Sequence, residues 1–129
     1  MKVRANDFGI CGVEQLFYAG TVAFDDTDAA TGVLLKKLPN NVIITRAVAV
    51  VTEAFDAGTT NVLTVGTNTD VDNVLGTSDI TEGTTGTYNK QTFVQAEAGA
   101  KLKAKYTQTG TAATAGSADI YVFFVSIPD

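Results

Sequence analysis

The chain has 129 residues, a hydrophobic content of 45% and a formal net charge of −5. This length predicts one domain that buries about two thirds of its unfolded surface, which is enough for a core without disulfide bonds. This net negative charge argues against wrapping by nucleic acid, which needs a basic surface, and no window approaches the ~20 apolar residues of a membrane-spanning helix. We therefore expect neither nucleic acid nor a membrane as a partner.

Residues 1–15 are predicted to form an extended N-terminal arm, because Gly9 and Gly12 break the segment. This start also lacks the apolar core of a secretory signal, so we expect the protein to be made in a cytosol and to stay soluble. Residues 16–129 are predicted to form the single folded domain. The apolar side chains of the arm are Phe8, Ile10 and Val13.

Runs of β-branched and aromatic residues, separated by glycine, proline and asparagine, predict an antiparallel all-β domain. The most informative segment spans residues 42–67, where a long run, a turn containing Gly58 and a second run predict a hairpin with unequal arms. Residues 69–78 are predicted to form one or two helical turns, and residues 79–89 a loop. The predicted strands span residues 16–24, 33–38, 42–55, 61–67, 91–95, 101–106 and 118–127.

Seven or eight short strands without a long helix predict a two-sheet β-sandwich. A jelly roll is the preferred variant, and an immunoglobulin-like sandwich is the alternative. Along residues 42–55, strict alternation assigns Ile44 to the same face as Val48, and Ile43 to the same face as Ala47. Neither face is cleanly polar, so this strand is predicted to be covered on both sides.

The last predicted strand is apolar on both faces. Ile120, Val122 and Phe124 share one face, and the opposite face carries Tyr121, Phe123, Val125 and Ile127. One sandwich core uses only one face of a strand, so the other must be covered by the arm or by another subunit, or remain exposed. We therefore expect an obligate oligomer whose interface includes Tyr121, Phe123 and Val125.

The residue types that most enzymes use for catalysis are scarce, so we expect no enzymatic activity. There is no histidine, and Cys11 therefore lacks the partner of a thiol protease. The glutamates that could serve glycoside hydrolysis are interpreted as solvated acids, because no aromatic platform flanks them. These are Glu14, Glu53, Glu82 and Glu97.

One spacing resembles a calcium-binding loop. Asn68, Asp70 and Asp72 alternate, and Asp79 stands at the place of a twelfth ligand. Asn73, however, occupies the position of the sharp turn, which requires glycine, and the last ligand should be a glutamate. We therefore interpret these side chains as loop and capping acids and expect no bound metal or other cofactor.

Lys101, Lys103 and Lys105 alternate with Leu102, Ala104 and Tyr106, which predicts a strand with its lysines facing outward. The preferred interpretation is protection of an exposed strand edge against aggregation. The alternative is an electrostatic docking site for an acidic partner.

Four segments are distinctive and read IITRA at 43–47, AFDAGTTNVLTVGT at 54–67, DVDNV at 70–74 and AKYTQTGTAATAG at 104–116. They resemble segments of small structural proteins of tailed bacteriophages, specifically the head decoration, or cement, proteins. The resemblance extends over about residues 42 to 127, and the arm has no clear match.

This resemblance implies a jelly-roll-like domain that trimerises on the outer surface of a capsid after synthesis in the host cytoplasm. Its partner would be the major capsid protein, whose subunits it would bridge to stabilise the shell against the pressure of packaged DNA. No substrate or cofactor is implied. The arm, through Phe8, Ile10 and Val13, is expected to contact a neighbouring capsid subunit.

The alternative function is a receptor- or carbohydrate-binding module of a phage fibre or tail. Sugar sites on sandwiches usually present exposed aromatic rings. Of the four tyrosines, only Tyr88 is predicted to lie in a loop.

Overall fold

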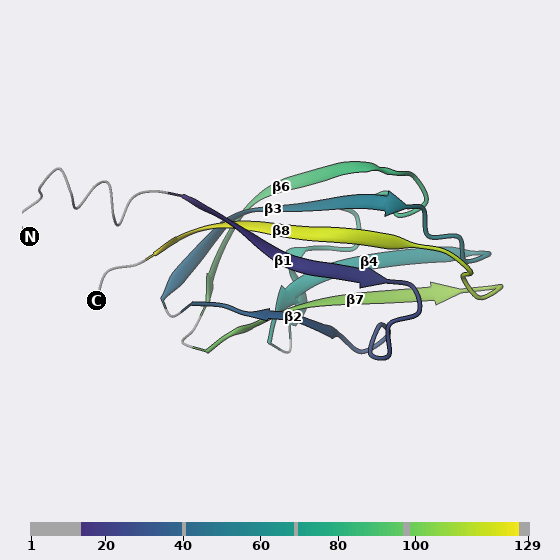
Figure 1. The fold of residues 1–129 in the computed structure, drawn as a ribbon, viewed down its shortest axis with the longest axis horizontal. Helices are drawn as coiled ribbons and strands as arrows, with labels where there is room; N and C mark the ends of the chain where they lie inside the picture. Colours follow the sequence, from purple (N-terminus) through teal and green to yellow (C-terminus); the bar gives the residue numbers. More distant parts are fainter. Residues whose placement is uncertain (1–13, 40, 69, 97–98, 127–129) are drawn as a thin grey trace, which may run out of the picture.

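Eight β-strands form the secondary structure of a computed structural model that describes residues 14–39, 41–68, 70–96 and 99–126 (Figure 1). These residues contain no helix, so none could cross a membrane. The all-β prediction is confirmed. The strands are β1 (Gln15–Ala23), β2 (Val33–Lys37), β3 (Val42–Glu53), β4 (Thr60–Thr67), β5 (Asp70–Leu75), β6 (Gly86–Ala96), β7 (Lys101–Thr109) and β8 (Ser117–Ser126).

The strands pair as the halves of one long hairpin. β1 pairs with β8, β2 with β7, β3 with β6 and β4 with β5, all antiparallel. The hairpin is rolled up, so that β8 also pairs with β3, and β7 with β4. The result is two four-stranded sheets, β1-β8-β3-β6 and β2-β7-β4-β5. This is the arrangement of a jelly roll, which confirms the preferred sandwich.

The predicted hairpin at residues 42–67 is wrong. Its two arms, β3 and β4, lie in different sheets. Both edges of β3 are occupied by β8 and β6, so β4 has no edge of β3 to pair with. The connecting residues carry the chain from one sheet to the other, and Phe55 is buried there against the ring of Tyr106, 4.6 Å away between centroids.

The predicted helix at residues 69–78 is also wrong, because Asp70–Leu75 form strand β5. This strand crosses close over β4: a Cβ on Gly66 would lie 1.8 Å from the carbonyl oxygen of Asp70. Val74 and Leu75 are buried in the core, and this burial overrides the weak local signal for a helix.

The loop predicted at residues 79–89 is shorter than expected, because β6 already begins at Gly86. Pairing with the second half of β3 draws Thr87 and Tyr88 into the sheet. In the same way, β7 extends to Thr109, which pairs with Thr60 of β4. In both cases a partner strand extends an element beyond its apolar run.

Strict alternation assigns the side chains at the start of β3 to the wrong faces of the sheet. The register shifts between Ile44 and Arg46 against both neighbouring strands, which is a β-bulge at Thr45. As a result Ile44 points into the core with Ala47, whereas Ile43 and Val48 lie on the outer face.

The core lies between the two sheets and is closed by alternating residues of the central strands. The predicted inward residues of β7, Leu102, Ala104 and Tyr106, are all buried. Ile120, Val122 and Phe124 of β8 are buried opposite them, as predicted. No buried side-chain nitrogen or oxygen of the described residues lacks a hydrogen-bond partner. The polar side-chain atoms buried between the sheets are therefore satisfied.

The preferred interpretation of the lysines of β7 is wrong. β7 lies between β2 and β4, so it is not a sheet edge. Lysines that protect an edge stand on a strand whose backbone is free on one side, and here both sides are paired.

Candidate interaction surface

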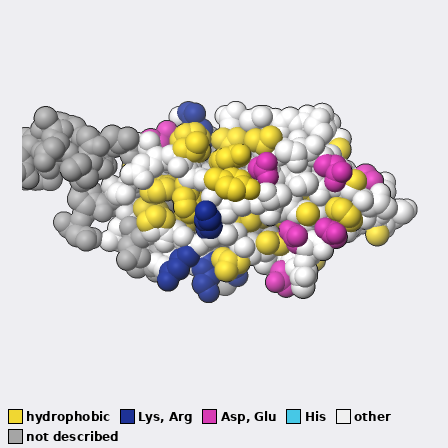
Figure 2. Space-filling view, viewed as in Figure 1, with side chains coloured by type: hydrophobic (Ala, Val, Ile, Leu, Met, Phe, Trp, Pro, Cys, Tyr) yellow, Lys and Arg dark blue, Asp and Glu magenta, His cyan; other side chains and the backbone are white. Residues whose placement is uncertain are grey.

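The outward side of the sheet β1-β8-β3-β6 carries many large apolar side chains, and we call it the outer apolar face. Phe93 is 84% exposed, Leu16 61% and Tyr18 46%. Figure 2 shows hydrophobic side chains gathered over the region where Figure 1 places β1, β8 and β3. The face comprises Leu16 and Tyr18 of β1, Tyr121, Phe123 and Val125 of β8, Ile43 and Val48 of β3, and Phe93 of β6.

The strand register brings these side chains together. Directly paired residues of an antiparallel sheet point to the same face. Tyr121 lies opposite both Tyr18 and Val48, and Phe123 lies opposite Leu16. The rings of Tyr18 and Tyr121 are 5.1 Å apart at an interplanar angle of 45°. Four strands therefore build one continuous apolar surface.

Polar groups border this surface on the β1 side. The register of β1 shifts between Tyr18 and Gly20, which places Thr21 opposite Asp119. Thr21 Oγ1 donates to Asp119 Oδ1 at 2.6 Å and lies 2.8 Å from the hydroxyl of Tyr18. An apolar centre with a hydrogen-bonded polar rim is the composition of a protein–protein interface.

A hollow of about 430 Å³ lies beside the β3 bulge. It is lined by Glu14, Thr45, Gln91, Thr92 and Phe93. Thr45 Oγ1 donates to the carboxylate of Glu14 and, at 3.3 Å, to the carbonyl oxygen of Phe123. Glu14 is the first described residue.

The side chain of Arg46 lies over the outer apolar face. The guanidinium carbon of Arg46 is 5.6 Å from the centroid of the Phe123 ring. Arginine stacked on an aromatic ring is frequent at binding surfaces, because it covers the ring and still offers hydrogen-bond donors.

The predicted interface residues Tyr121, Phe123 and Val125 all lie on the outer apolar face and are half-buried by their neighbours. Phe8, Ile10 and Val13 lie outside the described residues. Sequence reasoning missed the contributions of Leu16, Tyr18 and Phe93. The alternation of Leu16 and Tyr18 along β1 was available as a signal, but the position of Phe93 depends on where β6 pairs.

The glutamates do not all behave as solvated acids. Glu82 is only 7% exposed, and its Oε2 accepts a hydrogen bond of 2.7 Å from the backbone N–H of Leu63. Burial raises the pKa of Glu82, although the hydrogen bond from Leu63 opposes this. The interpretation of Glu82 as solvated is therefore wrong, and its role is to join the β5–β6 loop to β4.

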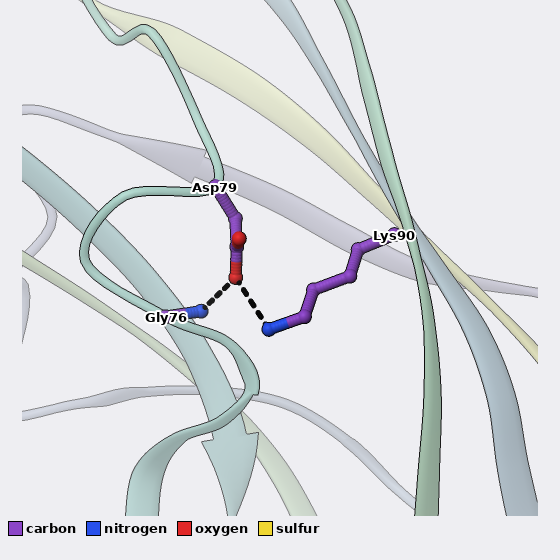
Figure 3. A network of polar contacts seen from close by, with 3 residues as sticks. All are labelled: Gly76, Asp79 and Lys90. Atoms are coloured by element: carbon purple, nitrogen blue, oxygen red, sulfur yellow. Dashed lines mark hydrogen bonds and ion pairs between the residues drawn. The ribbon is translucent and has the colours of Figure 1, made fainter.

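Asn68 and Asp79 of the calcium-like spacing have separate partners, whereas Asp70 and Asp72 lie beside each other, and a side-chain hydrogen bond with Asp72 raises the pKa of Asp70. Asn68 Oδ1 accepts from the backbone of Lys101. Asp79 Oδ2 accepts from Gly76 at 2.6 Å and from Lys90 at 2.9 Å (Figure 3). Burial raises the pKa of Asp79, but the bonds from Lys90 and Gly76 outweigh it and lower this pKa below its usual value. Among the described residues, no three acids or other metal-ligating side chains cluster.

Tyr88, predicted to lie in a loop, is instead a residue of β6 and packs partly against the core. Its hydroxyl donates to the carbonyl oxygen of Thr84 at 2.7 Å. The ring is therefore engaged in the fold and does not form the loop platform that a sugar site would use.

Two capsid structures contain chains that are similar in fold. A chain of the cyanophage Pam1 capsid asymmetric unit superposes with a TM-score of 0.71 and 17% sequence identity, over 98% of this chain and 94% of that one. A chain of the capsid of Ralstonia phage GP4 gives a TM-score of 0.62 and 15% identity, over 92% and 88%. No protein-family model and no curated protein matches the sequence.

Proposed function

We propose that this protein is a structural component of a bacteriophage virion that decorates the outer surface of the capsid and stabilises it by bridging major capsid subunits. The outer apolar face carries this proposal. In the described part of the chain, the sandwich has only two layers, and no segment covers this face. The fold similarity to chains of two phage capsids supports a structural role in a virion, and the sequence resemblance to decoration proteins supports the proposal that this role is on the outer surface.

The proposed mechanism is the burial of surface across subunit junctions. Apolar area removed from water contributes about 25 cal/mol per Å² before the costs of association. A shell that expands under internal pressure would have to expose this area again. The protein needs no catalytic group for this task, so it acts as an additional set of contacts.

Self-association is the proposed use of Tyr121, Phe123 and Val125. A homotrimer is favoured, because three linked copies convert modest single contacts into strong attachment through avidity. The arm, with Phe8, Ile10 and Val13, is proposed to contact a capsid subunit. Glu14, which belongs to the proposed arm, lines the hollow with Thr45 and Phe93, so we propose that a partner held by the arm lies next to the outer apolar face.

Electron microscopy of virions tests the proposal. We expect density for this sandwich on the outer capsid surface, at junctions between shell subunits and in copies related by symmetry. Density in the tail or a fibre, together with binding on a glycan array, would favour a receptor-binding module and contradict the proposal. The protein is expected to be made in the host cytoplasm and to join the shell there.

A further inference from the structure

A second surface lies on the opposite side of the sandwich. Lys37, Lys101, Lys103 and Lys105 lie on the outward side of the sheet β2-β7-β4-β5, and we call this the basic face. Lys37 is directly opposite Lys101, and the 54%-exposed Leu34 is directly opposite Lys103. Four of the nine lysines and arginines of the chain are therefore concentrated around one exposed leucine.

This concentration is unfavourable for the isolated protein. Like charges placed directly opposite each other on neighbouring strands destabilise a sheet. Among the described residues, no carboxylate forms an ion pair with any of these four lysines. The acids of the same sheet, Asp70 and Asp72, flank Val71 in β5. A Cβ on Gly32 would lie 3.5 Å from Lys103 and 3.7 Å from Val71, so this part of β5 is close to the basic face, yet neither acid forms an ion pair with its lysines. The fold thus gives these four lysines no ion-pair partner among the described residues.

Edge protection does not explain these lysines either, because β7 is paired on both sides. A local violation of a folding rule without compensation inside the fold is typical of a functional site. A partner surface that carries carboxylates would pair with these lysines, and Leu34 would form an apolar contact at the centre of the basic face. The occupant indicated by this chemistry is an acidic protein surface.

We propose that the basic face docks on an acidic surface of the capsid shell protein. This inference rests on the proposed function and specifies which side of the molecule faces the shell. The two outward faces of the sandwich point in opposite directions, so the basic face can bind the shell while the outer apolar face contacts other copies. The arrangement also orients the protein as it approaches the shell. The chain has a net charge of −5, so an acidic shell attracts the basic face and repels the rest of the surface.

The experiment measures binding of purified protein to capsid shells that lack it, at several salt concentrations. Two variants remove the same net charge. In the test variant, Lys101→Gln with Lys105→Gln, both substitutions lie on the basic face. In the control, Lys36→Gln with Lys90→Gln, neither lysine belongs to the basic face: Lys36 lies over the ring of Phe17, and Lys90 of β6 pairs with Asp79 of the β5–β6 loop. Circular dichroism melting verifies that both variants fold.

We expect the test variant to lose about tenfold in affinity at low salt and to show a weaker salt dependence, while the control stays within about twofold of wild type. Equal losses in the two variants would overturn the inference, since they would reflect net charge alone. Binding of a DNA fragment through the same lysines would overturn it too, as would a changed oligomer mass in the test variant, which would make a second copy the occupant. If wild type fails to bind shells at all, the proposed function fails and this inference falls with it.

Discussion

The two faces of the sheet β1-β8-β3-β6 are both apolar, yet they differ in how far they are buried. On the inner face, Ile120 and Val122 of β8 are fully buried under the second sheet. On the outer face of the same strand, Tyr121 and Phe123 receive only partial cover from neighbouring side chains. Apolar residues on a strand therefore either close the core or remain on the surface, where we propose that they contact another chain, and alternation alone does not distinguish these two cases.

The largest expected effect comes from the inner face. Ile120→Ala should lower the free energy of unfolding by about 2–5 kcal/mol, because it leaves a cavity in a filled core. Urea denaturation of the variant and of wild type measures this directly. A loss below 1 kcal/mol, or one no larger than that of Val125→Ala on the outer face, would remove the distinction between the two faces.

A somewhat smaller effect is expected from the buried polar contact beneath β4. Glu82→Ala leaves the N–H of Leu63 without its acceptor, and an unpaired buried N–H costs about 1–3 kcal/mol. The control is Glu82→Gln, whose side-chain oxygen can still accept this hydrogen bond. If the two variants were equally unstable in urea, the carboxylate charge and not the hydrogen bond would be the important feature.

On the outer face, substitution should change association more than stability. Phe123→Thr combined with Tyr121→Thr keeps β-forming residues at both positions and should lower the free energy of unfolding by less than Ile120→Ala does, because both side chains are only half-buried. Light scattering should show a lower mass than wild type at micromolar concentration. Wild type that is itself a stable monomer at this concentration would contradict the proposed oligomer interface.

Some of this structure follows from sequence and some does not. The alternation in 101–106 and 118–127 correctly identified the inward residues of β7 and β8, because both are central strands without a bulge between these residues. The partnership of β3 and β4 could not be found in this way, since a local turn signal says nothing about which edge is already occupied. The same limit explains the missed β5 and the early start of β6.

The candidate surface was only partly predictable for a related reason. The β8 residues were identified because both faces of one strand were apolar in the sequence. Leu16 and Tyr18 join them only through the register of β1, and Phe93 only through the pairing of β6. A surface shared among strands that are distant in sequence depends on topology, which the residue pattern did not supply.

The smallest expected effects concern the pH dependence of stability, which should differ between the interior carboxylate of Glu82 and the exterior carboxylate of Asp56. Hydrogen bonds from the Thr114 side chain and from the backbone of Thr114 and Ala115 lower the pKa of the exposed Asp56, so its stabilisation is present above the unfolded-state pKa and is lost as pH falls through the folded-state pKa. For Glu82, burial raises the pKa, so the folded state loses stability as pH rises from the unfolded-state pKa through the folded-state pKa.

Asp56→Asn should therefore be less stable than wild type at neutral pH, and Glu82→Gln more stable. Both differences should close in acid, where each carboxyl is protonated in the folded and the unfolded state alike. Urea midpoints measured from about pH 3 to 7 would show the two variants approaching wild type from opposite sides. Differences of the same sign would mean that the environment of Glu82 resembles the exterior more than the core, and the contrast between interior and outer surface would no longer hold for charged groups.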